Sequence, residues 1–330
     1  MIEVQDIIRK IFNRMQLLKL QDSTSLLIEK YNQPFRYYHT ISHIFDLLDK
    51  WDDCGYYKDD DEIFLAIMYH DAIYDPISTT NEEDSVMLFR SHMLKASELY
   101  NIDNDEMVKN VSQIIMDTKT HRPSNKKSEF FCKLDLSILS DSFATQIKFE
   151  HNIFKEFQFV DYKIYKEKRV EILKKLDASK ELIDYVQTRV PNIGLYAGSF
   201  NPFHKGHYNI LQKAEDIFDK VIIAFGVNIE KQQNSTGDIP DVLKYKQTDT
   251  YYTLLTDYMR NLDYPVTLVR GLRNATDLQY ETTFYRYMQD QMPDLKMVSI
   301  FCDKEYEHIS SSGIKTIRAF DDELANTYLP

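Results

Sequence analysis

Hydrophobic residues in the first part of the chain recur at the spacing of helices. Such a recurrence, every three or four residues, is typical of an amphipathic α-helix. One predicted face carries Val4, Ile7, Ile8, Ile11, Met15 and Leu18, and a later one carries Ile63, Ala66, Ile67 and His70. The stretch "TNEE" at Thr80–Glu83 predicts a capping box that opens a helix through 84–94. With two further helices expected at 160–176 and 179–190, we predict an all-α domain.

After Pro191 the pattern changes to short apolar runs that alternate with helical stretches. The runs predict strands at 192–198, 220–227, 265–272 and 295–302, and the other stretches predict helices at 207–218, 243–262, 277–292 and 310–320, with a loop at 232–240. Seven of the eight glycines lie at or after Gly194, where tight turns and phosphate loops would need them. This alternation predicts a Rossmann-like α/β domain with a parallel sheet covered on both faces.

The length of 330 residues suggests about two domains. We place a helical domain at 1–188 and an α/β domain at 190–330, because Pro191 ends the last helix of the first. A hydrophobic content of 43% is enough for a packed core in each domain.

The net charge of the chain limits the classes of partner that it is expected to bind. The formal net charge of −12 argues against a nucleic-acid or membrane-surface binder, but not against a small phosphorylated ligand held by local cations. No apolar run approaches the ~18–20 residues of a membrane span, and the start does not resemble a signal peptide. The cysteines Cys54, Cys132 and Cys302 lie far apart, which suits a reducing cytosol. We expect a cytoplasmic homo-oligomer that binds small molecules.

The stretch "AGSFNPFHKGH" follows the first predicted strand and leads into a helix. In an open parallel sheet, ligands bind at the carboxyl ends of strands, where helix N-termini favour anions. Gly198 would let the backbone approach a ligand, and Gly206 would allow the tight turn into the helix. His204 and His207 would donate to phosphate oxygens on which charge builds during nucleotidyl transfer.

Two other stretches carry groups suited to phosphate. "HISSSGIK" places three serines at the start of the last predicted helix, with Lys315 one turn later. "VRGLRNATDLQYE" places Arg270 and Arg273 just past a predicted strand. A serine N-cap and solvated surface arginines are the simpler alternatives if each stretch is taken alone.

Taken together, these motifs resemble the nucleotidyltransferase superfamily and, within it, phosphopantetheine adenylyltransferase. The resemblance covers about 192–330 and implies that ATP and 4′-phosphopantetheine give dephospho-coenzyme A and pyrophosphate, with Mg²⁺. It implies ATP binding by Gly198, Ser199, Phe200, His207, Gly271, Arg273, Glu281, Ser310, Ser311, Ser312 and Lys315, and acceptor binding by Ser199, Lys231 and Arg270. His207, His204, Lys231 and Arg273 are the expected catalytic residues.

Two positions depart from that family and leave a second acceptor open. The family usually has Thr where this chain has His204, and Asp where it has Asn201. "GSFNP" with two histidines is closer to the nicotinate or nicotinamide mononucleotide adenylyltransferases. The alternative function is therefore adenylyl transfer to one of these mononucleotides.

The helical domain contains a second set of candidate residues. His39 and His43, in "RYYHTISHI", share one face of a helix at i and i+4. His70 and Asp71 are adjacent at the end of an apolar helix, and Asp135 lies in the apolar stretch "CKLDLSIL". Histidine and carboxylate ligands suit a divalent metal, which lowers the pKa of bound water.

The ordered set resembles the HD superfamily of metal-dependent phosphohydrolases over about 20–185. The resemblance implies that His43, His70, Asp71 and Asp135 bind a divalent metal, with Mg, Mn, Fe and Zn not distinguished. A likeness of "YHxxxH" to cyclic-nucleotide phosphodiesterases makes His39 a candidate general acid, and His121 and Glu83 are weaker candidates. The alternative is a non-catalytic regulatory domain.

Overall fold

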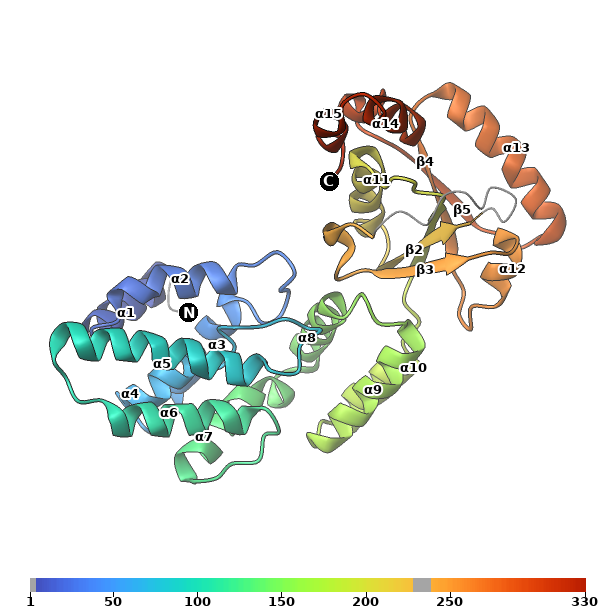
Figure 1. Ribbon diagram of the computed structural model, residues 1–330. Coiled ribbons are helices and arrows are strands. Elements are labelled where there is room, and N and C mark those ends of the chain that lie inside the picture. Colours follow the sequence, from blue (N-terminus) through green and yellow to red (C-terminus); the bar gives the residue numbers. More distant parts are fainter. Residues whose placement is uncertain (1–3, 228–238) are drawn as a thin grey trace. The chain divides into compact units, whose positions relative to one another are not determined.

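The computed structural model describes residues 4–227 and 239–330 (Figure 1). The first part of the chain is helical, as the hydrophobic pattern predicts. Its helices are α1 (Val4–Leu17), α2 (Gln21–Tyr31), α3 (Ile41–Cys54), α4 (Asp61–Tyr69), α5 (Asn81–Tyr100), α6 (Asp105–Thr118), α7 (Lys126–Asp135), a short 3-10 helix (Leu136–Ser140), α8 (Phe143–Glu156), α9 (Tyr162–Lys175) and α10 (Lys180–Thr188).

Helix α4 lies inside the helical part. Every residue from Ile63 to Tyr69 is buried, and a helix that is apolar on all sides needs neighbours on all sides. The Asp60 carboxylate caps the helix by accepting from the backbone N–H groups of Glu62 and Ile63 at 2.9 and 3.1 Å. The helix ends at His70, so its packing places that histidine in the buried interior.

Helix α5 begins where the sequence predicts, but without the capping box. Thr80 is the N-cap residue, yet its side chain caps no backbone N–H. Its hydroxyl donates instead to the Asp84 carboxylate at 2.9 Å. The predicted bond to the N–H of Glu83 is therefore wrong, because the hydroxyl has a charged acceptor one turn along.

The second part of the chain is a five-stranded parallel sheet with flanking helices (Figure 1). Its elements are β1 (Ile193–Gly198), α11 (Lys205–Glu215), β2 (Lys220–Gly226), β3 (Gln247–Tyr251), α12 (Leu255–Arg260), β4 (Thr267–Leu272), α13 (Ala275–Gln291), β5 (Met297–Phe301), α14 (Ser311–Arg318) and α15 (Asp322–Asn326), with 3-10 turns at Asp241–Leu243 and Lys304–Tyr306. The strand order is β3-β2-β1-β4-β5, and Leu195 of β1 pairs with Ile222 on one side and Leu268 on the other. The order reverses between β1 and β4, which is where ligands bind in such sheets.

The prediction of a single helix over 243–262 is wrong. Gln247–Tyr251 form β3, parallel to β2, and the helix α12 is confined to Leu255–Arg260. β3 is one of the two edge strands and pairs on one side only, and its residues "QTDTY" are mostly polar and half-buried. The strand therefore lacks the apolar run by which the other four strands are recognised.

By their contacts, the residues group into two compact units. One contains Met1–Glu156 with Ala178–Leu182, and the other contains Phe157–Asp177 with Ile183–Pro330. Helix α9, predicted as part of the helical domain, therefore groups with the sheet. None of the helices in the described ranges is long and apolar enough to cross a membrane.

Candidate functional site

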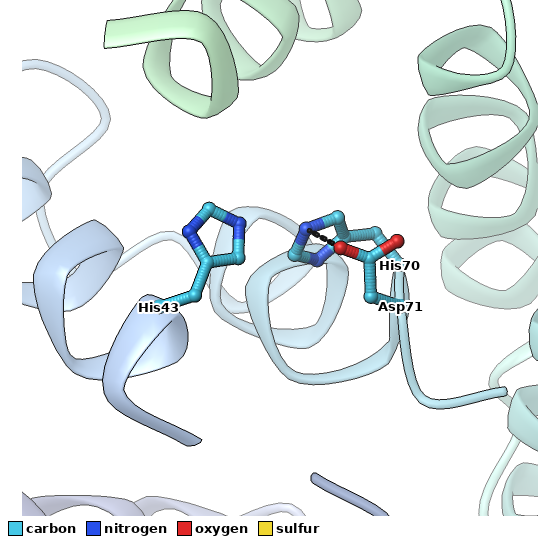
Figure 2. A group of neighbouring side chains, drawn as sticks. All are labelled: His43, His70 and Asp71. Carbon is cyan, nitrogen blue, oxygen red and sulfur yellow. Dashed lines mark ion pairs between the residues drawn. The ribbon is translucent and has the colours of Figure 1, made fainter. Parts of the chain in front are cut away.

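Three predicted metal ligands meet in the helical unit. His43 lies on α3, and His70 and Asp71 lie at the end of α4. Figure 2 shows the three side chains facing one another, and one potential ligand atom from each lies within 4.8 Å of the others. Both histidines are buried. Residues that are distant in sequence thus present two imidazoles and a carboxylate to one point, as a metal site requires.

Asp135, at the end of α7, joins this group. Its Oδ1 lies 3.2 Å from Nε2 of His43 and 3.5 Å from Nε2 of His70, and its Oδ2 lies 3.0 Å from Nε2 of His121. Burial alone would raise the pKa of the Asp135 carboxyl, but hydrogen bonds from His121 and His43 and the nearby ring of His70 hold it well below its usual value. The structure therefore brings all four predicted ligands together and adds His121 beside them.

The ring of His70 is oriented as a metal ligand would be. Its Nδ1 lies 3.1 Å from the carbonyl oxygen of Ile67, which can accept the Nδ1 proton, so Nε2 is the nitrogen that faces the carboxylates. That Nε2 is buried and has no well-directed hydrogen bond, although an oxygen of Asp71 lies 3.1 Å away. A buried nitrogen without a hydrogen-bond partner, close to the carboxylates of Asp71 and Asp135, is an arrangement that a divalent cation could occupy.

His39 is held by a residue that the sequence motifs did not indicate. The Oε2 atom of Glu156, on α8, lies 2.6 Å from Nδ1 of His39, and Oε1 accepts from the backbone N–H of His39 at 3.0 Å. Glu156 also accepts from the hydroxyl of Tyr74, whose ring stacks on His39 with centroids 4.3 Å apart. Burial opposes charge on His39, but the Glu156 carboxylate outweighs it and raises the pKa of the imidazole.

The two acidic residues in "TNEE" lie in different surroundings. Glu83 is paired with Lys119 at 2.5 Å on the surface. The pKa of Glu82 is raised by burial and by the negative charge of Asp71, and its carboxylate lies 3.9 Å from the same lysine. Their adjacency in sequence explains why the motif alone did not separate them.

The sheet unit contains a cavity of about 380 Å³ at the carboxyl ends of β1 and β4. This volume is in the range of small-molecule sites. From the predicted set, it is lined by Gly198, Ser199, Phe200, His204, His207, Arg270, Gly271, Arg273, Glu281, Ser310, Ser311 and Ser312. Three distant stretches therefore converge as the motifs predict. Lys315 is exposed on α14 and does not line the cavity, and Lys231 lies outside the described residues.

His204 and His207 cap α11 reciprocally. Nδ1 of His204 accepts from the N–H of His207, and Nδ1 of His207 accepts from the N–H of His204, both at 3.3 Å. Burial, together with the positive charge of Arg273, lowers the pKa of His204 to about 4. Burial, followed by the influence of His204 and Arg273, lowers the pKa of His207 well below its ordinary value. Both rings are therefore neutral at pH 7, and each carries its proton on Nε2 as a donor.

Two helix N-termini face this cavity. In α11 the N–H of Lys205 is taken by the carbonyl of Tyr328, whereas the described part of the chain offers no partner to the N–H of Gly206. In α14 the hydroxyl of Ser310 caps the N–H of Gly313 at 3.1 Å. Free N–H groups at a helix N-terminus attract anions.

The two arginines are already paired with carboxylates. Arg270 makes a bidentate ion pair with Glu281 at 2.6 and 2.7 Å and donates to the carbonyl of Ala197. Arg273 makes a bidentate pair with Asp277 at 2.9 Å. The cavity thus contains Asp277, as well as Tyr280, which the site prediction left out although both lie within "DLQYE".

Gly198 is required by the packing of Phe200. A Cβ on Gly198 would lie 2.9 Å from the Phe200 ring. Phe200 has a φ of +43° and is buried against Tyr196 and Phe225 with ring centroids 4.9 and 5.3 Å away. The ring therefore shapes the floor of the cavity as part of the core.

Comparisons with known proteins found a matching family and several similar proteins. The cytidylyltransferase-like family matches residues 195–317. A phosphopantetheine adenylyltransferase of Streptococcus pneumoniae (strain CGSP14) is 34% identical over 147 residues, which is 42% of this chain and 90% of that protein. The enzyme of strain 70585 is 33% identical over the same shares. A solved bifunctional NMN adenylyltransferase/ADP ribose pyrophosphatase from Francisella tularensis is 16% identical, with a TM-score of 0.30, over 42% of this chain and 44% of that one.

The matches to the pneumococcal enzymes extend over nearly their whole length and fall on the half of the chain that contains the cavity. This half is a nucleotidyltransferase domain, and through it the chain belongs to the phosphopantetheine adenylyltransferase family.

Proposed function

We propose that the sheet unit transfers the adenylyl group of ATP to 4′-phosphopantetheine, giving dephospho-coenzyme A and pyrophosphate. The observation that carries this proposal is the meeting of His204, His207, Arg273 and the Ser310–Ser312 run in one cavity between two helix N-termini. The identity to the pneumococcal enzymes supports this acceptor.

In the proposed reaction, an oxygen of the acceptor phosphate bonds to the α-phosphorus of ATP. The bond from that phosphorus to the bridging oxygen breaks, and pyrophosphate leaves with the electron pair. A phosphate monoester is largely ionised at pH 7, so no residue has to remove a proton from it. Mg²⁺ accompanies ATP and offsets the charge of its phosphates.

The residues of the chain supply position and charge. The Nε2–H groups of His204 and His207 donate to oxygens on which charge develops, and as neutral imidazoles they stabilise this charge by hydrogen bonding without transferring the proton. The N–H of Gly206 and the N-terminus of α14 add donors for the remaining phosphate oxygens. Arg273 offers a guanidinium at the same wall of the cavity.

The acceptor is tested by mixing the purified chain and MgATP with 4′-phosphopantetheine, nicotinate mononucleotide or nicotinamide mononucleotide. Pyrophosphate release is measured for each. Of the three acceptors, we expect only 4′-phosphopantetheine to give turnover. Turnover with a mononucleotide instead would replace the acceptor, and release with none of the three would refute the proposal.

We also propose that the helical unit is an HD-type metal-dependent phosphohydrolase. The convergence of His43, His70, Asp71 and Asp135, with the orphaned Nε2 of His70, supports a divalent metal at these residues. When bound, such a metal lowers the pKa of water and makes it a nucleophile toward phosphorus. Glu156 holds Nδ1 of His39, which leaves the Nε2 of that ring to protonate a leaving oxygen.

Hydrolysis of bis(p-nitrophenyl) phosphate by the full chain, with Mg²⁺, Mn²⁺, Fe²⁺ or Zn²⁺, tests this second activity. We expect turnover that is lost in His39→Ala while the metal is retained. A chain that binds metal stoichiometrically but hydrolyses no phosphodiester or phosphomonoester would favour a regulatory domain.

A further inference from the structure

The last residues of the chain contact the start of α11. The backbone N–H of Lys205, the first residue of that helix, donates to the carbonyl oxygen of Tyr328 at 3.0 Å. The ammonium of the same lysine donates to the carbonyl oxygen of Thr327 at 2.6 Å. Lys205 lies between His204 and Gly206, yet it does not line the cavity. The turn that carries both catalytic histidines is therefore attached to Thr327–Pro330, which we call the tail.

The tail is also attached to the serine helix. Tyr328 and Leu329 pack against a small apolar cluster that contains Ile309 and Ile314, on either side of the serine run. Ala325, in the short helix α15 that leads into the tail, is buried in the same cluster. The tail thus has one fixed end on α14 and makes its hydrogen bonds to α11.

A second contact links the same two turns. The hydroxyl of Ser311 donates to the carbonyl oxygen of Pro202 at 3.0 Å, in the loop just before His204. Ser311 is itself at the cavity wall, so this contact is part of the site. The tail is the link that lies outside the cavity and can be altered without removing a group that lines it.

We propose that Lys205 and the tail are positioning elements for nucleotidyl transfer: they hold the histidine turn of α11 and the serine turn of α14 at the spacing that one ATP phosphate chain requires. Both turns must contact the same chain of phosphates, so a change in their separation weakens both sets of contacts. A misplacement of about 1 Å can cost a factor on the order of 10² in rate. The proposal rests on the assignment of this cavity to ATP.

The test measures MgATP affinity by calorimetry in the full chain. We expect removal of Thr327–Pro330 to weaken ATP binding about tenfold and Lys205→Met to weaken it about threefold, because the latter keeps the backbone bond to Tyr328. In the truncated chain, Lys205→Met should have no further effect. Lys205→Arg should bind ATP like the unaltered chain, since arginine can still donate to the carbonyl of Thr327. Tyr328→Phe should also leave binding unchanged, because Tyr328 accepts through its backbone carbonyl.

The matched control is Lys213→Met. Lys213 lies on the same helix and also donates to a backbone carbonyl, that of Phe301, but at the other end of α11, where it also pairs with Asp303 at 2.6 Å. The substitution Lys213→Met removes the same charge as Lys205→Met and should change ATP affinity less than twofold. Thermal unfolding of every variant, followed by circular dichroism, separates loss of positioning from loss of fold.

Three results would overturn the proposal. Equal effects of Lys205→Met and Lys213→Met would show that the lysine acts only through charge or helix stability. Fully additive effects of Lys205→Met and the truncation would show that Lys205 acts on ATP itself. Failure of the full chain to bind MgATP would remove the basis of both proposals, whereas binding without transfer to 4′-phosphopantetheine would refute only the acceptor. If the truncated chain does not fold, the MgATP affinities of Lys205→Met, Lys205→Arg and Lys213→Met still test the proposal.

Discussion

The hydrogen bonds of His207 fix the tautomer of its ring, and the residue lines the cavity. Its Nδ1 is occupied by the N–H of His204, so its Nε2 is the donor that a phosphate can use. We expect His207→Ala to lower kcat for adenylyl transfer by a factor on the order of 10²–10³, as removal of one such donor does in comparable sites. Steady-state pyrophosphate release measures this. Near-normal turnover would contradict the assignment.

The same two histidines predict how stability depends on pH. Their pKa values are lowered in the folded state, to about 4 for His204, so below pH 6.5 the unfolded chain binds protons that the folded chain does not. This contribution is complete above the unfolded pKa and is lost as the pH falls from 6.5 toward 4. For His204 alone the loss at pH 5 is about 2 kcal/mol.

The matched variant for this prediction is His204→Asn, because Asn also caps helices but does not titrate. We expect unfolding of the sheet unit, identified by its stabilisation by ATP, to be less sensitive to pH between 7 and 5 in this variant. An identical pH dependence in both proteins would show that His204 titrates normally in the fold.

In the helical unit, Asp71 is the carboxylate adjacent to the orphaned Nε2 of His70. We expect Asp71→Ala to lose its divalent metal, as measured by elemental analysis of the purified protein. Asp141→Ala is the control, since Asp141 pairs with Lys50 at 2.8 Å and belongs to no cluster of ligands among the described residues. Stoichiometric metal in the Asp71 variant would refute the ligand set.

At the scale of elements, Gly271 sets how closely α11 packs on the sheet. A Cβ at this position in β4 would lie 3.0 Å from Cγ1 of Ile210 in α11 and 3.4 Å from the hydroxyl of Tyr196 in β1. We expect Gly271→Ala to destabilise the sheet unit by about 1–3 kcal/mol, the usual cost of an added methyl in a packed core. Thermal unfolding measures the loss. An unchanged unfolding temperature would mean that α11 can move away freely.

The strand β3 is formed by tertiary packing and not by its local sequence pattern. Its residues carry no apolar run, and Tyr251 and Tyr258 stack on one another with ring centroids 5.2 Å apart. The hydroxyl of Tyr258 donates to Asp249 at 2.6 Å, which joins β3 to α12. Pairing with β2 and these side-chain contacts, rather than local pattern, make this segment a strand.

At the scale of the whole molecule, α9 and the residues before it complete the sheet unit. Lys220 at the start of β2 is buried, and its ammonium donates to the carbonyls of Gln158 and Val160. The hydroxyl of Tyr264 donates to Asp161 at 2.5 Å, and its ring contacts that of Tyr162 edge to face. A fragment beginning at 190 would lack all these partners.

We therefore expect a fragment of residues 157–330 to be more stable than one of 190–330, by about 3 kcal/mol or more, from the lost hydrogen bonds and aromatic contact. Urea unfolding of both fragments measures the difference. The longer fragment should transfer adenylate without the helical unit. Equal stability of the two fragments would place the boundary where the sequence alone puts it, near Pro191.

The sequence alone predicted the class of each half and many of the residues that line the cavity of the sheet unit, but it missed Asp277 and Tyr280. The period of the apolar residues separates helices from buried strands, and the candidate phosphate-binding motifs lie at the ends of strands or in the connections that follow them. Because the carboxyl ends of parallel strands meet at one edge of the sheet, order along the chain is enough to predict that these motifs converge. The histidines and aspartates that meet in the helical unit were likewise predicted from their residue types and order.

Only the tertiary structure decided the contacts between residues that no local pattern relates. Glu156 lies 117 positions after His39, and Tyr328 lies far beyond Lys205, so neither pair leaves a periodic signal in the chain. The strand β3 and the grouping of α9 with the sheet depend on pairing and burial against distant partners. A side chain or carbonyl can satisfy a buried polar group from any point in the sequence, and only folding selects which one does.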